Sequence, residues 1–282
     1  MKNNRALSFI IIFIIYTLST LLGILLCDLL TLSFWIELLI ADIVVTSFIF
    51  IFSCILKNAS VYDPYWSVQP IVITVAYMIY MNNYTLTSIL FVLVICLWGI
   101  RLTANWAYTF KNLNVQDWRY TMLKEKTKNI YPIINFIGIH MVPTLIVYSC
   151  VVPAVTVIVE GGTLNIIVIF GLLLSTFAFT LQGIADIQMH QFRKQKKTGF
   201  IRDGLWKYSR HPNYLGEILM WWGIGIAAIA SLEDKIYLIL GAILNTLLFL
   251  FVSIPMADKR NSKRGDMIKL KQETRMLLPI KK

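Results

Sequence analysis

The sequence has little charge, few cysteines and few histidines, and these shortages exclude several classes of protein. Only 15% of its 282 residues are charged, whereas 57% are hydrophobic, which is too much apolar surface for one water-soluble core. The four cysteines stand alone in apolar segments and the three histidines are scattered, so no metal site is expected. No serine or cysteine nucleophile motif is present. The composition indicates a protein whose solvent is the lipid bilayer.

Long apolar runs follow one another along most of the chain. A helix needs roughly 20 apolar residues to cross the hydrocarbon, and the runs predict an all-α, polytopic membrane helical bundle of about eight transmembrane helices. The third run is marginal in length, and Pro143 and Pro153 should kink or split the fifth. The first run lacks a small-residue cleavage site, so we interpret it as a retained helix. The runs are 7–26, 35–56, 65–81, 86–110, 133–159, 164–190, 212–230 and 236–256.

The basic residues are distributed in a way that predicts the orientation of these helices. Short cytoplasmic loops retain lysine and arginine. With both termini cytoplasmic, only Lys235 lies in an outer loop and Arg101 inside a span, out of 26 basic residues. Sidedness therefore accounts for the net charge of +11, and no nucleic-acid partner is expected.

Polar side chains recur along the sixth apolar run. Gln182, Asp186, His190 and Arg193 follow one another at steps of three and four residues, which places them on one face of a helix. Ionisable groups at membrane depth are costly and often functional. The alternative, which we weigh equally, is that Asp186 pairs with a neighbouring arginine and only locks helices together.

The densest polar cluster beside an apolar run extends from Ser209 to Glu217. Pro212 suits the first position of a helix, so Asn213 and Glu217 should share a face one turn apart. Helix-start amides and Arg210 could hold a phosphate there. His211 could instead be a cap or an interfacial residue.

Two other segments carry polar groups near predicted membrane boundaries. Asp63 and Tyr65 open the third run, where Asp63 has the position of an ordinary cap beside an aromatic belt. Arg101 could reach the interface or pair with Asp63. The spacing of the glycines at 223 and 225 is similar to that of a dinucleotide-binding motif. They lie inside a predicted span, however, so we interpret them as residues that allow helices to pack closely.

These polar segments resemble one known family. Ala185-Asp186-Ile187-Gln188, Phe192-Arg193 and the stretch 204–217, which contains Arg210-His211-Pro212-Asn213-Tyr214 and Glu217, resemble the steroid 5-alpha-reductase-like membrane family. More narrowly, they resemble its branch described as DUF1295. The resemblance extends over most of the chain from about residue 60.

The resemblance implies a fold and a reaction. Within one domain, 1–282, helices of 131–282 would enclose NADPH from the cytoplasmic side, and the more variable helices of 1–130 would receive a steroid-like or isoprenoid lipid from the bilayer. Hydride would reduce a carbonyl-conjugated C=C bond while an acid hydrogen-bonds the carbonyl oxygen. By position, the cofactor residues would be Gln182, Asp186, Arg193, Arg210, His211, Asn213, Tyr214 and Arg260. The candidate catalytic residues are Glu217, Tyr214, Asp63 and Tyr65.

The chain also departs from the family. Relatives usually carry tyrosines where Met267 and Leu270 stand, and a lysine where Met189 stands. If those side chains bind the nucleotide in relatives, the affinity of this chain for NADPH would be altered or lost. Two other functions stay open: an S-adenosylmethionine-dependent methyltransferase of the isoprenylcysteine type, and a non-catalytic lipid-binding membrane protein. Because the family branch that this chain resembles is of the bacterial type, we expect the protein to lie in a bacterial plasma membrane.

Overall fold

The computed structural model describes residues 2–195, 199–233, 235–263 and 265–281. The long helices are α1 (Arg5–Leu29), α2 (Phe34–Ile55), α3 (Tyr65–Tyr80), α4 (Leu86–Thr109), α7 (Val142–Glu160), α8 (Ile166–Lys194) and α9 (Pro212–Leu232). The last span, Ile236–Asn261, is built from successive 3₁₀, α and π segments and contains α10 (Leu240–Leu248). Short helices α5 (Trp118–Thr127), α6 (Tyr131–Ile133), α11 (Ile254–Asn261) and α12 (Met267–Glu273) complete the fold. The described residues contain no β-strand, only an isolated bridge between Ser209 and Arg275.

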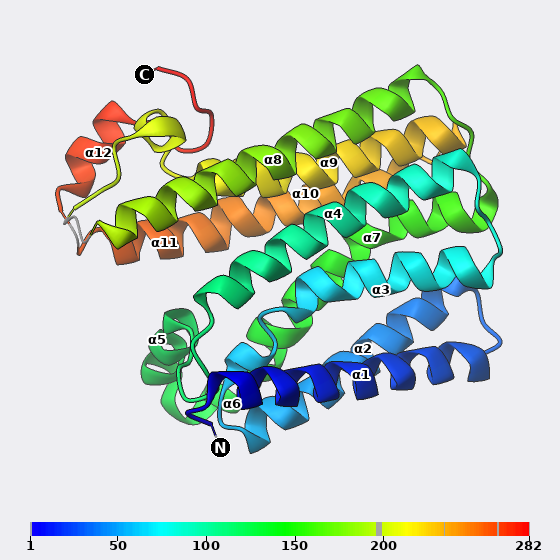
Figure 1. The fold of residues 1–282 in the computed structure, drawn as a ribbon, viewed down its shortest axis with the longest axis horizontal. Coiled ribbons are helices and arrows are strands. Elements are labelled where there is room, and N and C mark those ends of the chain that lie inside the picture. The colour runs from blue at the N-terminus through cyan, green and yellow to red at the C-terminus, as the bar shows by residue number, and fades with distance from the viewer. Residues whose placement is uncertain (1, 196–198, 234, 264, 282) are drawn as a thin grey trace.

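The expected all-α membrane bundle is confirmed. Seven helices in the described part of the chain are long and apolar enough to cross a membrane, and α3, with 16 residues, is shorter but lies alongside them (Figure 1). Both termini lie at the same end of the bundle (Figure 1). That arrangement is the one that eight crossings require.

The two prolines of the fifth span do not split it. The segment runs from α6 through a π-helical turn, η3 (Ile134–Met141), into α7. Pro143 stands in the first turn of α7 and Pro153 lies inside that helix. A π turn widens the helix locally, and η3 ends immediately before the helix that carries both prolines.

Helices α8 and α9 pack closely because small residues face each other. A Cβ atom added at Gly171 would lie 2.7 Å from the Gly223 carbonyl oxygen and 2.9 Å from the Ala227 Cβ. The Ser175 hydroxyl donates to the Met220 carbonyl across this contact at 2.8 Å. The interpretation of Gly223 as a packing residue is confirmed, and the close approach fixes how the polar face of α8 meets α9.

Gly171→Ala is expected to destabilise the protein by about 1–3 kcal/mol, because the methyl group must push α8 away from α9. Thermal unfolding in detergent measures the effect. Gly138→Ala is the matched control, since its Cβ would lie 3.8 Å from the nearest atom, in Ile134. Equal melting temperatures for the two variants would contradict the packing argument.

Candidate functional site

Glu217 marks the deep end of a polar network inside the bundle. Its side chain is buried in α9 and accepts three hydrogen bonds from neutral donors. The Trp98 indole and the Gln182 amide each donate to Oε2 at 3.0 Å, and the Trp221 indole donates to Oε1 at 2.9 Å. Every contact is made by a neighbouring helix or by the next turn of α9. The carboxyl group is therefore held in one position and enclosed.

The network continues through Arg101 to the polar face of α8. Arg101, on α4, donates to the Gln182 Oε1 at 2.6 Å and to the Asp186 Oδ2 at 2.9 Å. The predicted pairing of Arg101 with Asp63 is wrong, because the guanidinium turns toward α8. Farther along the same face, the His190 Nε2 lies 2.7 Å from the Asn105 Oδ1. The polar face of α8 thus packs against α4, and the pair that could lock these helices together is formed.

Two buried polar atoms beside this network have no hydrogen-bond partner in the described structure. They are the Nε of Arg101 and the Oδ1 of Asn213. Asn213 lies in the first turn of α9, and its side chain interacts with Asp186. A buried group without a partner is costly, so these atoms indicate where a ligand with complementary polar groups would be stabilised.

Arg210 and His211 hold the C-terminal tail. The Arg210 guanidinium donates to the Thr274 carbonyl at 2.9 Å and to the Asp258 Oδ2 at 3.5 Å. The His211 Nε2 lies 2.8 Å from the Asp258 Oδ1, and its ring stacks on Tyr214 with centroids 5.2 Å apart. The first turn of α9, α11 and the tail therefore form one unit.

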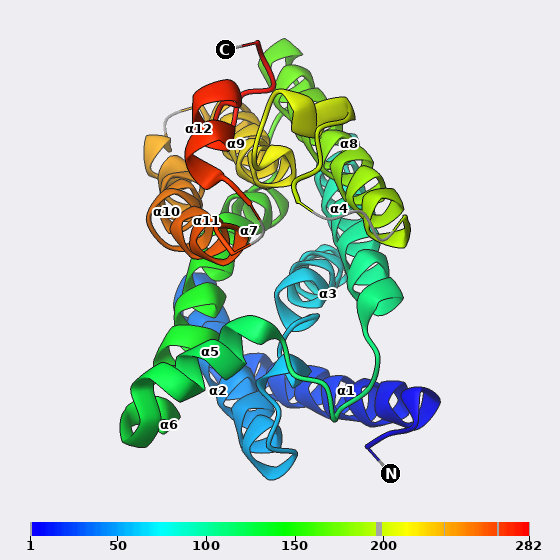
Figure 2. The ribbon, with the colours of Figure 1, turned by 90° about the vertical axis from the view of Figure 1, so that its left-hand side faces the viewer.

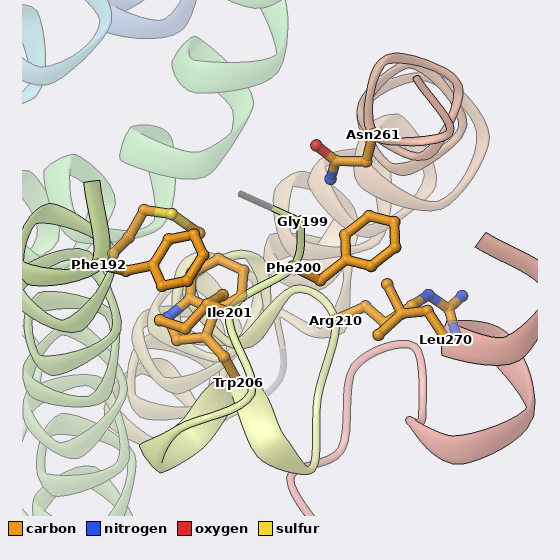
Figure 3. Close-up of a pocket in the computed structure, with 9 residues that line it drawn as sticks. Phe192, Gly199, Phe200, Ile201, Trp206, Arg210, Asn261 and Leu270 are labelled. Carbon is orange, nitrogen blue, oxygen red and sulfur yellow. The ribbon is translucent and has the colours of Figure 1, made fainter. Parts of the chain in front are cut away.

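A small cavity of about 40 Å³ lies between α8, the following loop, α11 and α12 (Figure 3). Figure 3 shows Phe192 and Trp206 on one side, Leu270 and Arg210 on the other, and Asn261 above them. Met189 also lines the cavity, so two of the three departures from the family meet here. A space of this size holds water-sized groups only, and a dinucleotide would have to displace the tail.

Cationic and aromatic side chains gather where α5 faces α9 and α11. The Arg260 guanidinium lies 4.3 Å from the Trp118 ring centroid. The charges of Arg119 and Arg260 act on Tyr214, and those of Asp117 and Asp186 oppose them. Arg193 stands in the last turn of α8, on the same end of the bundle. Guanidinium groups suit phosphate because they offer paired donors.

Asp63 lies at this end too, between η1 (Ala59–Val61) and α3. The Tyr120 hydroxyl donates to its Oδ1 at 2.5 Å. Burial, reinforced by the charge of Asp117, raises the pKa of Asp63 from 3.8 to about 6, and the charge of Arg119 opposes the rise. A carboxyl group that titrates near neutral pH is suited to exchange protons.

The raised pKa of Asp63 predicts how the stability of the protein depends on pH. Because the native state binds a proton to Asp63 more tightly than the unfolded chain does, the free energy of unfolding should fall as the pH rises from about 4 to about 6. Asp63→Asn should remove this contribution, so the melting temperature of the variant should fall less over that interval. Parallel melting curves against pH for both proteins would contradict the assignment.

Tyr65 belongs to a second polar centre, which includes a residue that sequence reasoning missed. Its hydroxyl donates to the Asp42 Oδ1 at 2.6 Å, and the Gln69 amide donates to the Asp42 Oδ2 at 2.9 Å. Asp42 is only 4% exposed in the middle of α2. The rings of Tyr16 and Tyr62 lie 6.1 and 5.5 Å from that of Tyr65. An acid inside an apolar run was the signal that could have found Asp42.

Helix α7 contributes residues next to both polar centres. Thr144 hydrogen-bonds with Tyr62 at 2.8 Å and with Thr46 at 3.0 Å. Cys150, six residues later, lies close enough to Glu217 to be influenced by its charge. A rise of 1.5 Å per residue separates these two contacts by about 9 Å along the helix, so α7 connects the two centres.

One family profile matches most of the chain. Residues 49–274 match the profile described as "Protein of unknown function (DUF1295)". A protein of Schizosaccharomyces pombe named "Uncharacterized protein C594.04c" is 28% identical over 198 residues, which are 58% of this chain and 56% of that protein. The chain thus matches about half the length of this relative. No solved structure matches this chain. Within the described residues, no group of three or more His, Cys, Asp or Glu side chains could hold a metal ion.

Proposed function

This chain belongs to the DUF1295 family, and from that premise we propose that it is an NADPH-dependent reductase embedded in the membrane. Its substrate would be a steroid-like or isoprenoid lipid with a C=C bond conjugated to a carbonyl group. The observation that carries the proposal is the buried polar network Glu217–Gln182–Arg101–Asp186. It extends from membrane depth toward the end of the bundle where arginines gather.

The residues of this region suit NADPH chemically. Bound NADPH would supply a hydride. Arg193 and Arg260 offer guanidinium donors for phosphates, and the unpaired Oδ1 of Asn213 can accept a hydrogen bond from a carboxamide. Gln182 and Asp186 keep Arg101 fixed beside the site. Arg210 and His211 position the tail that must open and close over the cofactor.

The Tyr65–Asp42 pair is the best candidate for the acid. A protonated Asp42 can donate to the Tyr65 oxygen, so that the tyrosine's own proton is free for the substrate's carbonyl oxygen as negative charge develops there. Gln69 holds the carboxyl group in place. Asp63 with Tyr120 is the second such pair, at the cytoplasmic end, whereas Glu217 is enclosed and acts in our proposal by positioning Gln182.

Oxidation of NADPH by the purified protein tests the proposal. A panel of lipids with a conjugated enone should accelerate the loss of NADPH absorbance, and the matching saturated ketones should not. Oxidation at equal rates with both sets would contradict reduction of a conjugated bond.

Asn213→Ala is expected to weaken NADPH binding by about tenfold, because the bound cofactor loses one hydrogen bond in a buried site. Energy transfer from tryptophan to NADPH measures the Kd. Asn245→Ala is the matched control, since Asn245, on α10, likewise has a buried side-chain atom without a hydrogen-bond partner in the described structure. An unchanged Kd for Asn213→Ala would return Asn213 to a packing role.

A further inference from the structure

A second, larger cavity lies away from the proposed cofactor site. Its volume is about 220 Å³, and its lining residues come from the end of α2, the turn η1, α5 and the α6–η3 segment. These elements lie together at the end of the bundle that carries both termini (Figure 2). A cavity of ~150 Å³ is known to hold benzene, so this one has room for a small ligand.

The charged groups at this cavity are both cations. Lys57, just past the end of α2, and Lys124, on α5, line it, and no acidic side chain is found among the described residues of its wall. The Lys124 ammonium also lies 5.9 Å from the centroid of the Tyr131 ring. The electrostatic environment favours an anion.

Two side chains of the wall are buried and have unsatisfied polar atoms. Ser53 is 1% exposed and Asn135 is 6% exposed, yet the Ser53 Oγ and the Asn135 Oδ1 have no hydrogen-bond partner in the described structure. The other amides of the wall are used within the fold: Asn58 donates to the Leu113 carbonyl and Gln116 accepts from the Ala59 amide. The Asn135 oxygen would be satisfied by a ligand that carries a hydrogen-bond donor, and the Ser53 hydroxyl can either donate or accept.

Exposed isoleucines stand next to lining residues in both helical segments of the wall. Ile51 and Ile55 on α2 are 53% and 63% exposed, and Ile133 and Ile137 on the α6–η3 segment are 60% and 51% exposed. On a membrane-spanning segment, such side chains face acyl chains. An anion in the cavity would therefore lie next to the apolar surface that these isoleucines form, as the headgroup of a lipid lies next to its acyl chains.

We propose that this cavity binds a phosphate ester that carries a hydroxyl group, supplied as the headgroup of an anionic glycerophospholipid. Lys57 and Lys124 would pair with the phosphate. Ser53 and Asn135 would accept from the hydroxyl groups. The π-helical turn η3, which carries Asn135, is a feature often found at functional sites.

The test compares lipid and soluble ligands on the full-length protein in detergent. Phosphatidylglycerol should raise its melting temperature more than phosphatidylcholine does, and glycerol phosphate should have no comparable effect. Equal stabilisation by glycerol phosphate would overturn the lipid assignment. No preference for phosphatidylglycerol over phosphatidylcholine would overturn the site.

Variants locate the effect. Lys57→Gln with Lys124→Gln should weaken phosphatidylglycerol binding by at least about tenfold, since charge-assisted hydrogen bonds are lost. Lys111→Gln with Lys126→Gln is the matched control, because these exposed lysines lie outside the cavity. Ser53→Ala should lower the affinity severalfold without changing the melting temperature of the lipid-free protein. An equal loss of phosphatidylglycerol affinity in both double variants would show that only the general surface charge matters, and it would contradict the proposal.

Discussion

Tyr65→Phe is expected to lower the turnover of an enone lipid by about 100- to 10,000-fold, the range that a positioned acid contributes. The variant keeps the ring among its aromatic neighbours and loses only the hydroxyl group that joins Asp42. NADPH affinity should stay within about twofold, because the proposed cofactor residues lie on α8, at the start of α9 and on α11, away from Tyr65. Single-turnover kinetics and a separate NADPH titration measure the two quantities.

Tyr16→Phe is the matched control for this experiment. Tyr16 packs against Tyr65, but its hydroxyl donates to the Val61 carbonyl at 2.8 Å and not to a carboxylate. Its loss should affect stability slightly and turnover little. Similar turnover losses in both variants would show that the aromatic cluster is only structural. Undiminished turnover in Tyr65→Phe would move the acid to Asp63 and Tyr120.

Arg101→Met is expected to destabilise the fold by about 3–5 kcal/mol, because it leaves Asp186 as an uncompensated charge in a largely buried site. The side chains of Arg101 and Asp186 are only 21% and 15% exposed. The variant also removes the donor that holds Gln182, so NADPH binding should fall with stability. Unfolding in detergent and a cofactor titration would record both losses.

The double variant Arg101→Met with Asp186→Leu distinguishes the locking role from the binding role. Removing both charges should recover most of the stability. It should not recover NADPH binding, because the polar network at the site is gone. Recovery of both would assign the pair to packing alone. Arg202→Ala is the surface control: its pair with Glu273 is 42% and 45% exposed, and its loss should cost less than about 1 kcal/mol.

The membrane bundle could be predicted from the sequence because lipid imposes a simple rule. Every spanning segment must satisfy its own backbone and present apolar side chains for roughly 20 residues. The predicted starts at residues 65 and 212 coincide with those of α3 and α9. The steps of three and four residues also placed Gln182 and Asp186 on one face, as their shared partner Arg101 confirms.

Contacts between helices could not be predicted in the same way. Spacing along one helix says which residues share a face, but it does not say which helix that face meets. Arg101 was expected either to reach the interface or to pair with Asp63, and it pairs with Asp186 instead. The contact of His211 with Asp258 joins residues 47 positions apart. Asp42 was missed because one acid hardly changes the hydropathy of a long apolar run.

The competing functions differ in the ligand that they require. A methyltransferase would bind S-adenosylmethionine, which carries a positive sulfonium and no phosphate, whereas a reductase would bind a polyanion. Arg193 and Arg260, in the last turns of α8 and α11, favour the polyanion because guanidinium groups pair with phosphate. A non-catalytic lipid-binding protein would need neither ligand.

The most direct test of the proposed function is the melting temperature of the detergent-purified protein with NADPH, NADH or S-adenosylmethionine. A ligand that binds only the folded state stabilises it by about 2.7 kcal/mol at 100 times its Kd. We expect a rise of several degrees with NADPH and none with S-adenosylmethionine. A rise with S-adenosylmethionine alone, or no rise with any of the three, would rule out the proposed reductase.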